Sequence, residues 1–217
     1  MHRSPRSAVL VGLLAVVALV LVAGCSSGGS SAKASPTKAT TDEPWPAPPD
    51  PLARARAAGL VPETAERLEH HVHSHLDVYL NGKKILVPGG IGINTKDPGV
   101  HSGTVLGQPA YGGITVPCDQ PCISPLHTHD ASGILHTESA TDVDNTLGQF
   151  FTEWGVTLSP TCVGTYCGPK TPIAIYVDGQ RFTGDPRTIP LTNFKEIAIV
   201  IGTPPAKIPA EGDFSQI

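Results

Sequence analysis

The sequence predicts a mainly β fold, either a β-sandwich or a small barrel of hairpins, with a few short helices. Glycine and proline are frequent, at 23 and 22 of 217 residues, and helix-forming runs are few, as is typical of short strands joined by many turns. Two pairs, Asn81-Gly82 and Asp178-Gly179, lie between strand-like runs and are strong hairpin signals. Residues 51–217 have the length of one domain, so a single β-rich domain is expected there.

The first 24 residues are predicted to be a lipoprotein signal peptide. Arg3 and Arg6 precede an apolar run over residues 8–23, which leads into Gly24-Cys25. Small residues before a cysteine are typical of a lipobox, in which Cys25 receives the lipid (palmitate) and becomes the mature N-terminus. A transmembrane anchor is the alternative, but the run is too short for an ordinary span. We therefore expect a protein held by its lipid at the outer face of the cytoplasmic membrane.

Residues 25–50 are predicted to form a flexible tether. The stretch is rich in Ser, Gly, Ala, Thr and Pro, so it cannot bury a core, and Trp45 within it either docks on the domain or is exposed.

Loss of the signal peptide removes two of the 15 basic residues and none of the 19 acidic residues, which leaves a net charge of −6 with histidine neutral. No basic patch with interleaved aromatics is present, so nucleic acid is excluded as a partner, and no pattern identifies a protein partner.

Local patterns predict the elements of the first part of the domain. Two short helical turns are expected at residues 51–58 and 62–68, because Gly59 separates them and a proline stands at the start of each. Alternation with period two predicts a strand over residues 71–80, and residues 83–88 return after the Asn81-Gly82 turn. One face of the first strand is apolar, and the opposite face carries His71, His73, His75, Asp77 and Tyr79.

Further elements are expected downstream. Residues 89–124 are rich in Gly and Pro and are predicted to be mostly loop, and residues 125–139 form a hairpin with its turn at 130–133. Thr146 and Gln149 have the spacing of a capping box, which predicts a helix that ends at Gly155. Strands are predicted over residues 173–177 and 196–202. The helix buries an apolar stripe of Leu147, Phe150, Phe151 and Trp154.

Four cysteines follow the tether: Cys118, Cys122, Cys162 and Cys167. An even number outside the cytoplasm predicts two disulfides, for which three pairings exist. Cys118–Cys122 with Cys162–Cys167 is the simplest pairing, since each bond then closes a small loop. The alternative makes the cysteines metal ligands, because Cys122 lies just before His127. Free thiolates outside the cell are readily oxidised, which favours the disulfides.

Seven of the eight histidines that follow the signal peptide lie in two clusters. In the 125–139 hairpin, alternation places His127 and His129 on one face, with His127 opposite His136 and His129 opposite Ile134. Glu138 follows on the same face. Imidazoles gathered on one patch repel one another once protonated and gain little unless they bind an ion. The hairpin therefore predicts a transition-metal site.

The second cluster lies on the 71–80 strand, whose histidine face is expected to pack against this hairpin. His70 and His71 are interpreted as part of a solvated strand face. Imidazole ligands suit copper or zinc, as well as nickel or iron. The predicted metal ligands are His127, His129, His136, His73 and His75, with Asp77, Asp130 or Glu138 as a further ligand or as an acceptor that orients an imidazole.

Two motifs carry a resemblance. Residues 125–139 read Pro-Leu-His-Thr-His-Asp-Ala-Ser-Gly-Ile-Leu-His-Thr-Glu-Ser, and residues 146–155 read Thr-Leu-Gly-Gln-Phe-Phe-Thr-Glu-Trp-Gly. His-x-His followed by Glu is typical of cupin metal sites, but the spacing here differs because His136 intervenes, so the chain is not assigned to the cupins. With its two motifs, the 65–205 region resembles a family of uncharacterised prokaryotic secreted or lipid-anchored proteins, and its lipobox and tether resemble actinobacterial, mycobacterial-like ones. The resemblance implies no particular activity.

Three functions are compatible with these patterns. The first is a surface-anchored protein that captures, buffers or delivers copper or zinc. The second is a metal-dependent enzyme, in which three histidines hold the metal and Glu138 or Asp130 is the base toward a metal-bound water. No motif identifies a reaction, so catalysis stays an open question. The third is a metal-free, β-rich interaction module stapled by disulfides.

Overall fold

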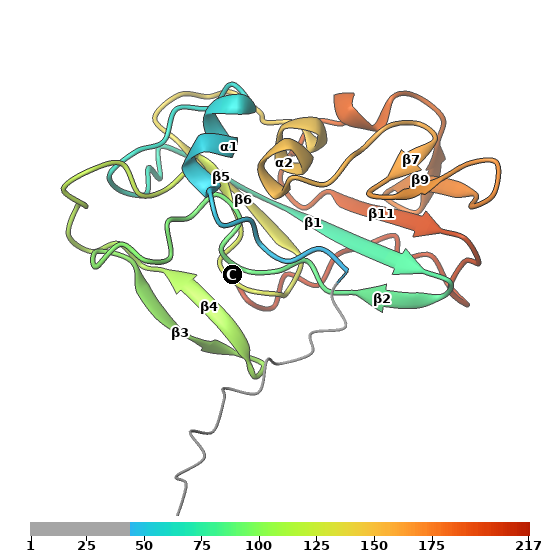
Figure 1. Ribbon diagram of the computed structural model, residues 1–217, viewed down its shortest axis with the longest axis horizontal. Coiled ribbons are helices and arrows are strands. Elements are labelled where there is room, and N and C mark those ends of the chain that lie inside the picture. The colour runs from blue at the N-terminus through green and yellow to red at the C-terminus, as the bar shows by residue number, and fades with distance from the viewer. Residues whose placement is uncertain (1–43) are drawn as a thin grey trace, which may run out of the picture. The chain divides into compact units, whose positions relative to one another are not determined.

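The computed structural model describes residues 44–217. The predicted signal peptide, the lipidated Cys25 and the tether up to residue 43 lie outside the described residues. The described chain is mainly β with two short α-helices, which confirms the predicted fold class. Its main sheet is open (Figure 1), so the alternative of a closed barrel is wrong.

Strand β1 (His70–Leu80) is the centre of the seven-stranded main sheet. It pairs in parallel with β11 (Glu196–Ile201) on one edge. On the other edge it pairs antiparallel with β6 (Ile134–Ser139) along its first half and with β2 (Lys83–Ile85) at its end. The remaining strands of this sheet are β5 (Leu126–His127) beside β6, β9 (Ile173–Val177) beside β11, and β10 (Gln180–Phe182) beside β9.

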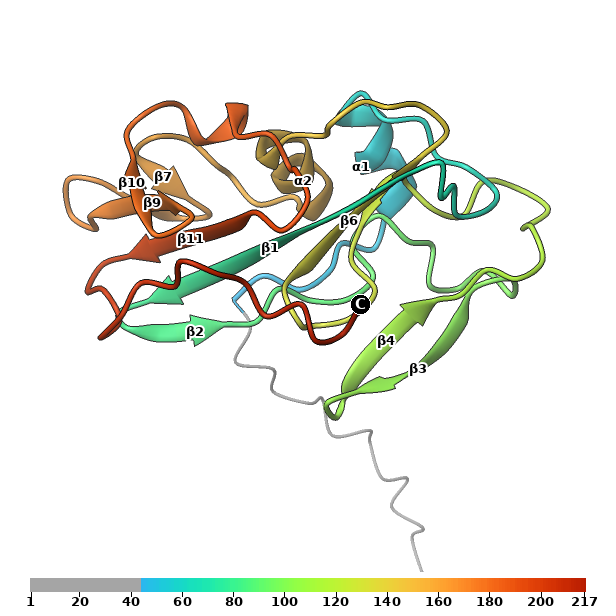
Figure 2. The same cartoon turned by 180° about the vertical axis from the view of Figure 1, so that it is seen from behind.

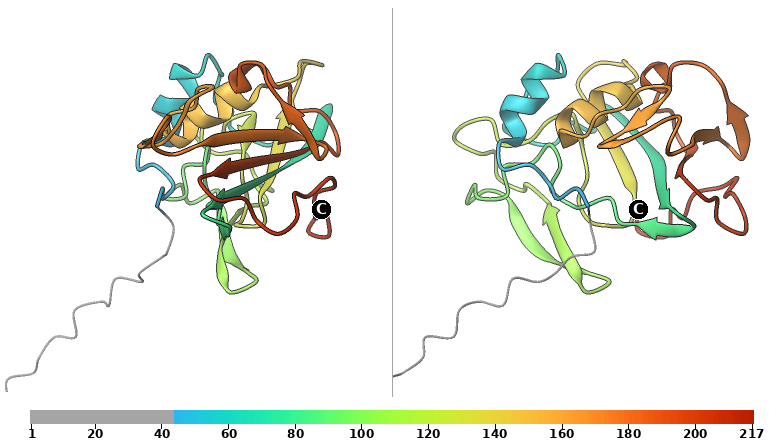
Figure 3. Two further views of the ribbon diagram at one scale, coloured as in Figure 1. Left: turned by 90° about the vertical axis from the view of Figure 1, so that its right-hand side faces the viewer. Right: turned by 45° about the vertical axis from the view of Figure 1, so that its right-hand side comes forward.

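Helices cover one face of this sheet, as both views of Figure 3 show. Alternation along β1 points Leu76 and Val78 into a core with the aromatic side chains of helix α2 (Leu147–Trp154). Each fully buried side chain of this size contributes about 1.5–3 kcal/mol. His71, His73 and His75 of β1 therefore occupy the opposite face, as the sequence pattern predicts.

The ends of α2 also confirm the sequence pattern. Gln149 N donates to the hydroxyl of Thr146, and Thr146 N donates to the side-chain oxygen of Gln149, which together form the capping box. Gly155 ends the helix with φ 74°, a left-handed conformation that glycine adopts without strain. The predicted first helix is present as α1 (Pro51–Ala57), and a 3₁₀ turn spans Pro186–Thr188.

The second predicted helical turn, over residues 62–68, is wrong. Glu63 N donates to Ile123 O, and Cys122 N donates to Glu63 O. These bonds hold Glu63 in an isolated antiparallel bridge with Ile123. The backbone groups that a helix would need are therefore already paired with a distant segment.

The stretch predicted as mostly loop, residues 89–124, contains a further hairpin. Strand β3 (His101–Val105) pairs with β4 (Gln108–Gly112) across Leu106 and Gly107, whose φ values are 51° and 78°. Positive φ at both turn positions suits the twist of a two-residue hairpin. Seen from behind, this hairpin stands apart from the main sheet (Figure 2).

Two disulfides brace the loops, Cys118–Cys122 and Cys162–Cys167, which is the simplest of the predicted pairings. The first lies in a small separate core with Ile93 and Ile123. The second joins strands β7 (Cys162–Val163) and β8 (Tyr166–Cys167). Neither pair of cysteines is available as thiolate ligands.

Trp45, at the end of the predicted tether, docks on the domain. Its ring meets those of Trp154 and Tyr166 edge to face, with centroids 5.9 and 6.1 Å apart, and its carbonyl accepts a hydrogen bond from Trp154 Nε1. Trp45 and Ala47 thus pack against the core of the domain. Within the described residues, no helix has the length and apolar character needed to span a membrane.

Candidate metal centre

The candidate metal centre lies where β5 and β6 meet, on the sheet face away from the helices. His127 in β5 pairs with His136 in β6, as the hairpin pattern predicts. His129 lies beyond the end of β5, so its predicted pairing with Ile134 is wrong, and Ile134 pairs with His75 of β1 instead. The physical reason is that the backbone after His127 bonds to another segment: Thr128 N donates to Ile91 O, and His129 O accepts from Tyr111 N.

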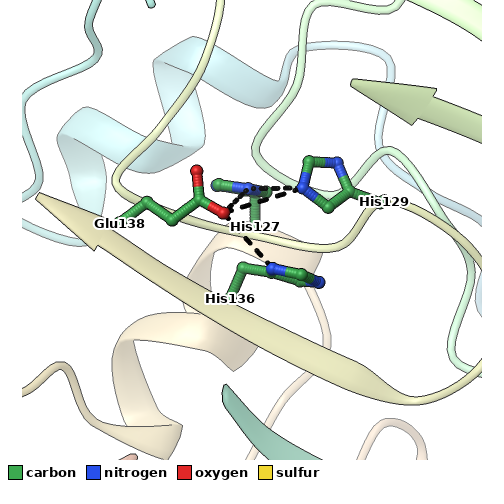
Figure 4. Close-up of side chains that lie close together, drawn as sticks. All are labelled: His127, His129, His136 and Glu138. Carbon is green, nitrogen blue, oxygen red and sulfur yellow. Dashed lines mark hydrogen bonds and ion pairs between the residues drawn. The ribbon is translucent and has the colours of Figure 1, made fainter. Parts of the chain in front are cut away.

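Four side chains converge here, those of His127, His129, His136 and Glu138. Each offers one ligand atom, and these atoms lie within 4.8 Å of one another. Figure 4 shows a carboxylate oxygen of Glu138 facing all three rings. This Oε1 atom is 3.8 Å from Nε2 of His127 and of His129 and 3.3 Å from Nδ1 of His136. We call these four residues the inner site.

Backbone carbonyls orient two of the imidazoles. His127 Nδ1 lies 2.8 Å from Ser124 O, and His129 Nδ1 lies 2.7 Å from Tyr111 O. Because a carbonyl oxygen only accepts hydrogen bonds, Nδ1 carries a proton in both rings. Each ring therefore turns Nε2 toward the inner site. Metal-binding histidines are commonly held in this way, with the other ring nitrogen bonded to a carbonyl or carboxylate.

Two of the ligand-atom spacings match those around a small divalent ion, and the two from Glu138 Oε1 to the Nε2 atoms are wider, at 3.8 Å. Nitrogens at about 2.0–2.1 Å from a tetrahedral ion lie about 3.3 Å apart. The two Nε2 atoms of His127 and His129 are separated by 3.3 Å, and so are His136 Nδ1 and Glu138 Oε1. His136 Nδ1 is moreover buried and makes no hydrogen bond. Buried polar atoms normally have a partner, and a bound ion would supply one here.

Burial and neighbouring charges set the protonation of the inner site. Burial holds the pKa of His127 well below its ordinary value and also lowers the pKa of His136. Burial acts on His129 too, but the contact with Glu138 outweighs it and raises the pKa of His129. Burial alone would raise the pKa of Glu138, yet the surrounding imidazoles hold it well below its usual range. The carboxylate of Glu138 and the neutral forms of His127 and His136 are thus favoured, whereas His129 binds its proton more tightly than an ordinary histidine.

The two histidine clusters meet through the pairing of β1 with β6, as predicted. His73 pairs with His136, and His71 pairs with Glu138. The rings of His73 and His136 have centroids 4.6 Å apart, and His71 Nε2 lies 3.2 Å from Glu138 Oε1. Burial and the neighbouring imidazoles of His136 and His71 lower the pKa of His73 to about 4. His71 is exposed, as the sequence pattern predicts, but its ring also contacts the cluster. His70 is half-buried beside Asp142, so its solvated interpretation is wrong.

His75 lies apart from the inner site, contrary to the prediction. Its Nδ1 is 2.6 Å from Glu196 Oε2, and its Nε2 is 3.1 Å from Ser132 O. Burial lowers the pKa of His75, but the hydrogen bond and the charge of Glu196 outweigh burial and raise it. The ring ties the 130–133 turn to β11 and belongs, with Asp77 and Glu196, to a separate buried group whose ligand atoms also lie within 4.8 Å of one another.

The two aspartates proposed for the site also lie elsewhere. Asp77 is 2.5 Å from Lys84 Nζ and accepts a hydrogen bond from the hydroxyl of Tyr79. Asp130 accepts from Ser132 N at 2.8 Å and shapes the turn. Of the three carboxylates named from the sequence, only Glu138 therefore belongs to the inner site, whereas Asp77 lies beside His75.

Sequence reasoning missed the backbone acceptors of Ser124 and Tyr111. Tyr111 lies in the hairpin that was expected to be loop, so no local signal connects it with His129. A side chain at Gly112 would collide with the His129 ring, and its φ of 136° is unfavourable for other residues. A glycine at this position therefore lets β4 approach the histidine closely.

A shallow depression of about 380 Å³ opens beside His129, where Glu66, His101 and Tyr111 contribute to its lining. His129 is thus the member of the inner site that faces this space.

No family model, curated protein or solved structure matches the chain. What the fold and the site define is a β-rich domain with a cluster of three histidines and one glutamate that could hold a metal ion.

Proposed function

We propose that this protein is a membrane-anchored extracytoplasmic lipoprotein that binds one zinc or copper ion through His127, His129 and His136, with Glu138 as the fourth ligand. The observation that carries the proposal is the convergence of four ligand atoms within 4.8 Å. Two of the imidazoles are already oriented by backbone carbonyls. The negative charge of Glu138 further offsets the charge of a divalent ion.

The donor set favours a divalent ion such as zinc or copper(II) over copper(I). Copper(I) prefers thiolate and thioether sulfur, whereas imidazole and carboxylate suit the divalent ions. The four cysteines of the domain form disulfides, and the one methionine of the chain is Met1. The inner site therefore offers only nitrogen and oxygen.

The cellular location rests on the lipobox and on the disulfides. Disulfides persist outside the cytoplasm and are rare within it, which agrees with the predicted export of this chain. The tether between Cys25 and the packed domain would hold the metal site close to the membrane surface. Metal capture, buffering or delivery at that surface is the activity that we propose.

The decisive experiment measures bound metal in the mature domain, purified without a histidine tag. Zinc-loaded wild-type protein should retain about one equivalent after gel filtration, the stoichiometry of a single site. The His127→Ala, His129→Ala double variant should lose this tight equivalent. The matched control is the His70→Ala, His101→Ala double variant, which also removes two imidazoles but none that belongs to the inner site. Full retention of zinc by the first variant would refute the assignment.

The depression beside His129 favours a second candidate, a metal-dependent enzyme with a small substrate. An enzyme of this kind needs a metal position open to substrate or water. Cobalt-loaded protein provides the test, because its visible spectrum reports the coordination number. A spectrum that changes when a small anion such as azide is added supports the enzyme. An unchanged spectrum supports a closed binding site.

A further inference from the structure

The rim of the inner site carries two imidazoles, His71 and His73, that the proposed function does not use. Together with His136 they offer ligand atoms that lie within 4.8 Å of one another. The ring centroids of His71 and His73 are 4.4 Å apart, and those of His73 and His136 are 4.6 Å apart. We call these three residues the outer triad. The pairing of β1 with β6 holds them together.

The outer triad is continuous with the inner site. His136 belongs to both, and Glu138 Oε1 lies 3.2 Å from His71 Nε2 and 3.3 Å from His136 Nδ1. Side-chain exposure falls along this line, from 36% for His71 through 12% for His136 and 4% for Glu138 to 1% for His127. Ligand atoms are thus available at every depth between solvent and the buried end of the inner site.

We propose that the outer triad is an acquisition site, which takes a zinc or copper(II) ion from solvent and passes it to the inner site by ligand exchange. His71 and His73 hold the ion first, and His127 and His129 replace them while His136 remains a ligand. Each exchange breaks one metal–nitrogen bond and forms another, with no change of oxidation state. Any proton on an incoming imidazole leaves to solvent. The inference rests on the proposed function, because the inner site is the destination of the ion.

A direct route to the inner site is the main rival. His129 lines the open depression together with His101, so an ion could reach Nε2 from that side. The three imidazoles of the outer triad lie close enough together to bind one ion. His101, in contrast, belongs to none of the groups of described residues that could hold an ion. If the ion enters through the outer triad, loss of His71 and His73 should slow metal loading. If it enters through the depression, loss of His101 should slow metal loading.

The test follows zinc loading of the mature protein by stopped flow, with zinc supplied from a chromophoric chelator. The His71→Ala, His73→Ala variant should load at least about tenfold more slowly, the scale on which loss of supporting ligands alters metal sites. It should still reach about one tight equivalent at equilibrium. The His70→Ala, His101→Ala control should load as the wild type does. A His71→Gln, His73→Gln pair retains polar side chains and should be equally slow if the alanine variant folds poorly.

The outcomes separate this inference from the proposed function. Loading of the His71→Ala, His73→Ala variant at the wild-type rate would overturn the acquisition site and leave the inner site intact. Equal slowing of the His70→Ala, His101→Ala control would also overturn it and point to the depression instead. A wild-type protein that retains no tight zinc at equilibrium would refute the proposed function itself, and the acquisition site with it.

Discussion

Glu153 provides a quantitative test of the packing behind the metal centre. Its side chain lies in α2 with no exposed surface, and neither carboxylate oxygen has a hydrogen-bond partner. Burial raises the pKa of Glu153 from 4.5 to about 8, although the side chain of Ser124 opposes the change. Ser124 also supplies the carbonyl that orients His127. Ionisation of Glu153 would therefore disturb the segment that positions a proposed ligand.

The sign and the size of the effect follow from these two pKa values. Between pH 4.5 and 8 the folded protein keeps a proton on Glu153 that the unfolded chain has released. Its contribution to stability is therefore complete below pH 4.5 and is lost as the pH rises toward 8. Glu153 is partly titrated in the unfolded chain at pH 5 and in the folded protein at pH 8, so the loss between these pH values is about 3–4 kcal/mol at 1.36 kcal/mol per pKa unit.

The perturbation is Glu153→Gln, which keeps the size of the side chain and cannot ionise. Urea unfolding of metal-free protein at pH 5 and pH 8 gives the free energy of unfolding for each variant. Between these pH values the wild type should lose about 3–4 kcal/mol more than Glu153→Gln does, since all other titrating groups are shared. Glu211→Gln, which changes an exposed glutamate, should behave like the wild type. The same pH dependence in wild type and Glu153→Gln would refute the reasoning.

Two further perturbations address the histidines. His75→Ala should lower the free energy of unfolding by about 3–5 kcal/mol, because it leaves the carboxylate of Glu196 buried without its partner. Urea denaturation of the two proteins measures this loss. A loss below about 1 kcal/mol would contradict a stabilising buried pair. Zinc binding at pH 6 should release about one proton, because the pKa of His129 is raised and its Nε2 must lose a proton before it can bind a metal. Calorimetry in two buffers of different ionisation enthalpy counts the protons, and no release would contradict this protonation state.

Much of the local structure could be predicted because its causes lie within a few residues. Asn81-Gly82 has φ values of 50° and 82°, and Asp178-Gly179 has 50° and 74°, so both pairs turn the chain between the expected strands. The capping box of α2 likewise depends on residues three apart. The failed helix at 62–68 shows the limit of such reasoning. Glu63 pairs with Ile123, which lies 60 residues further on, and no local pattern reports that bond.

The candidate site likewise has features that the sequence predicts and features that only the tertiary structure decides. Alternation and a short turn were sufficient to place His127 opposite His136 and to set the histidines on the face away from the core. Only the tertiary structure decided that His71 and His73 lie beside Glu138 and His136, since a shift of one residue in the β1–β6 register would turn one set of side chains to the other face. It also decided that His75 is hydrogen-bonded to Glu196 and Ser132, and that Tyr111 orients His129. The sequence by itself thus determined which side chains share a face, because alternation is a property of each strand alone. Which faces meet depended on contacts between distant segments, and those arise only when the whole sheet has formed.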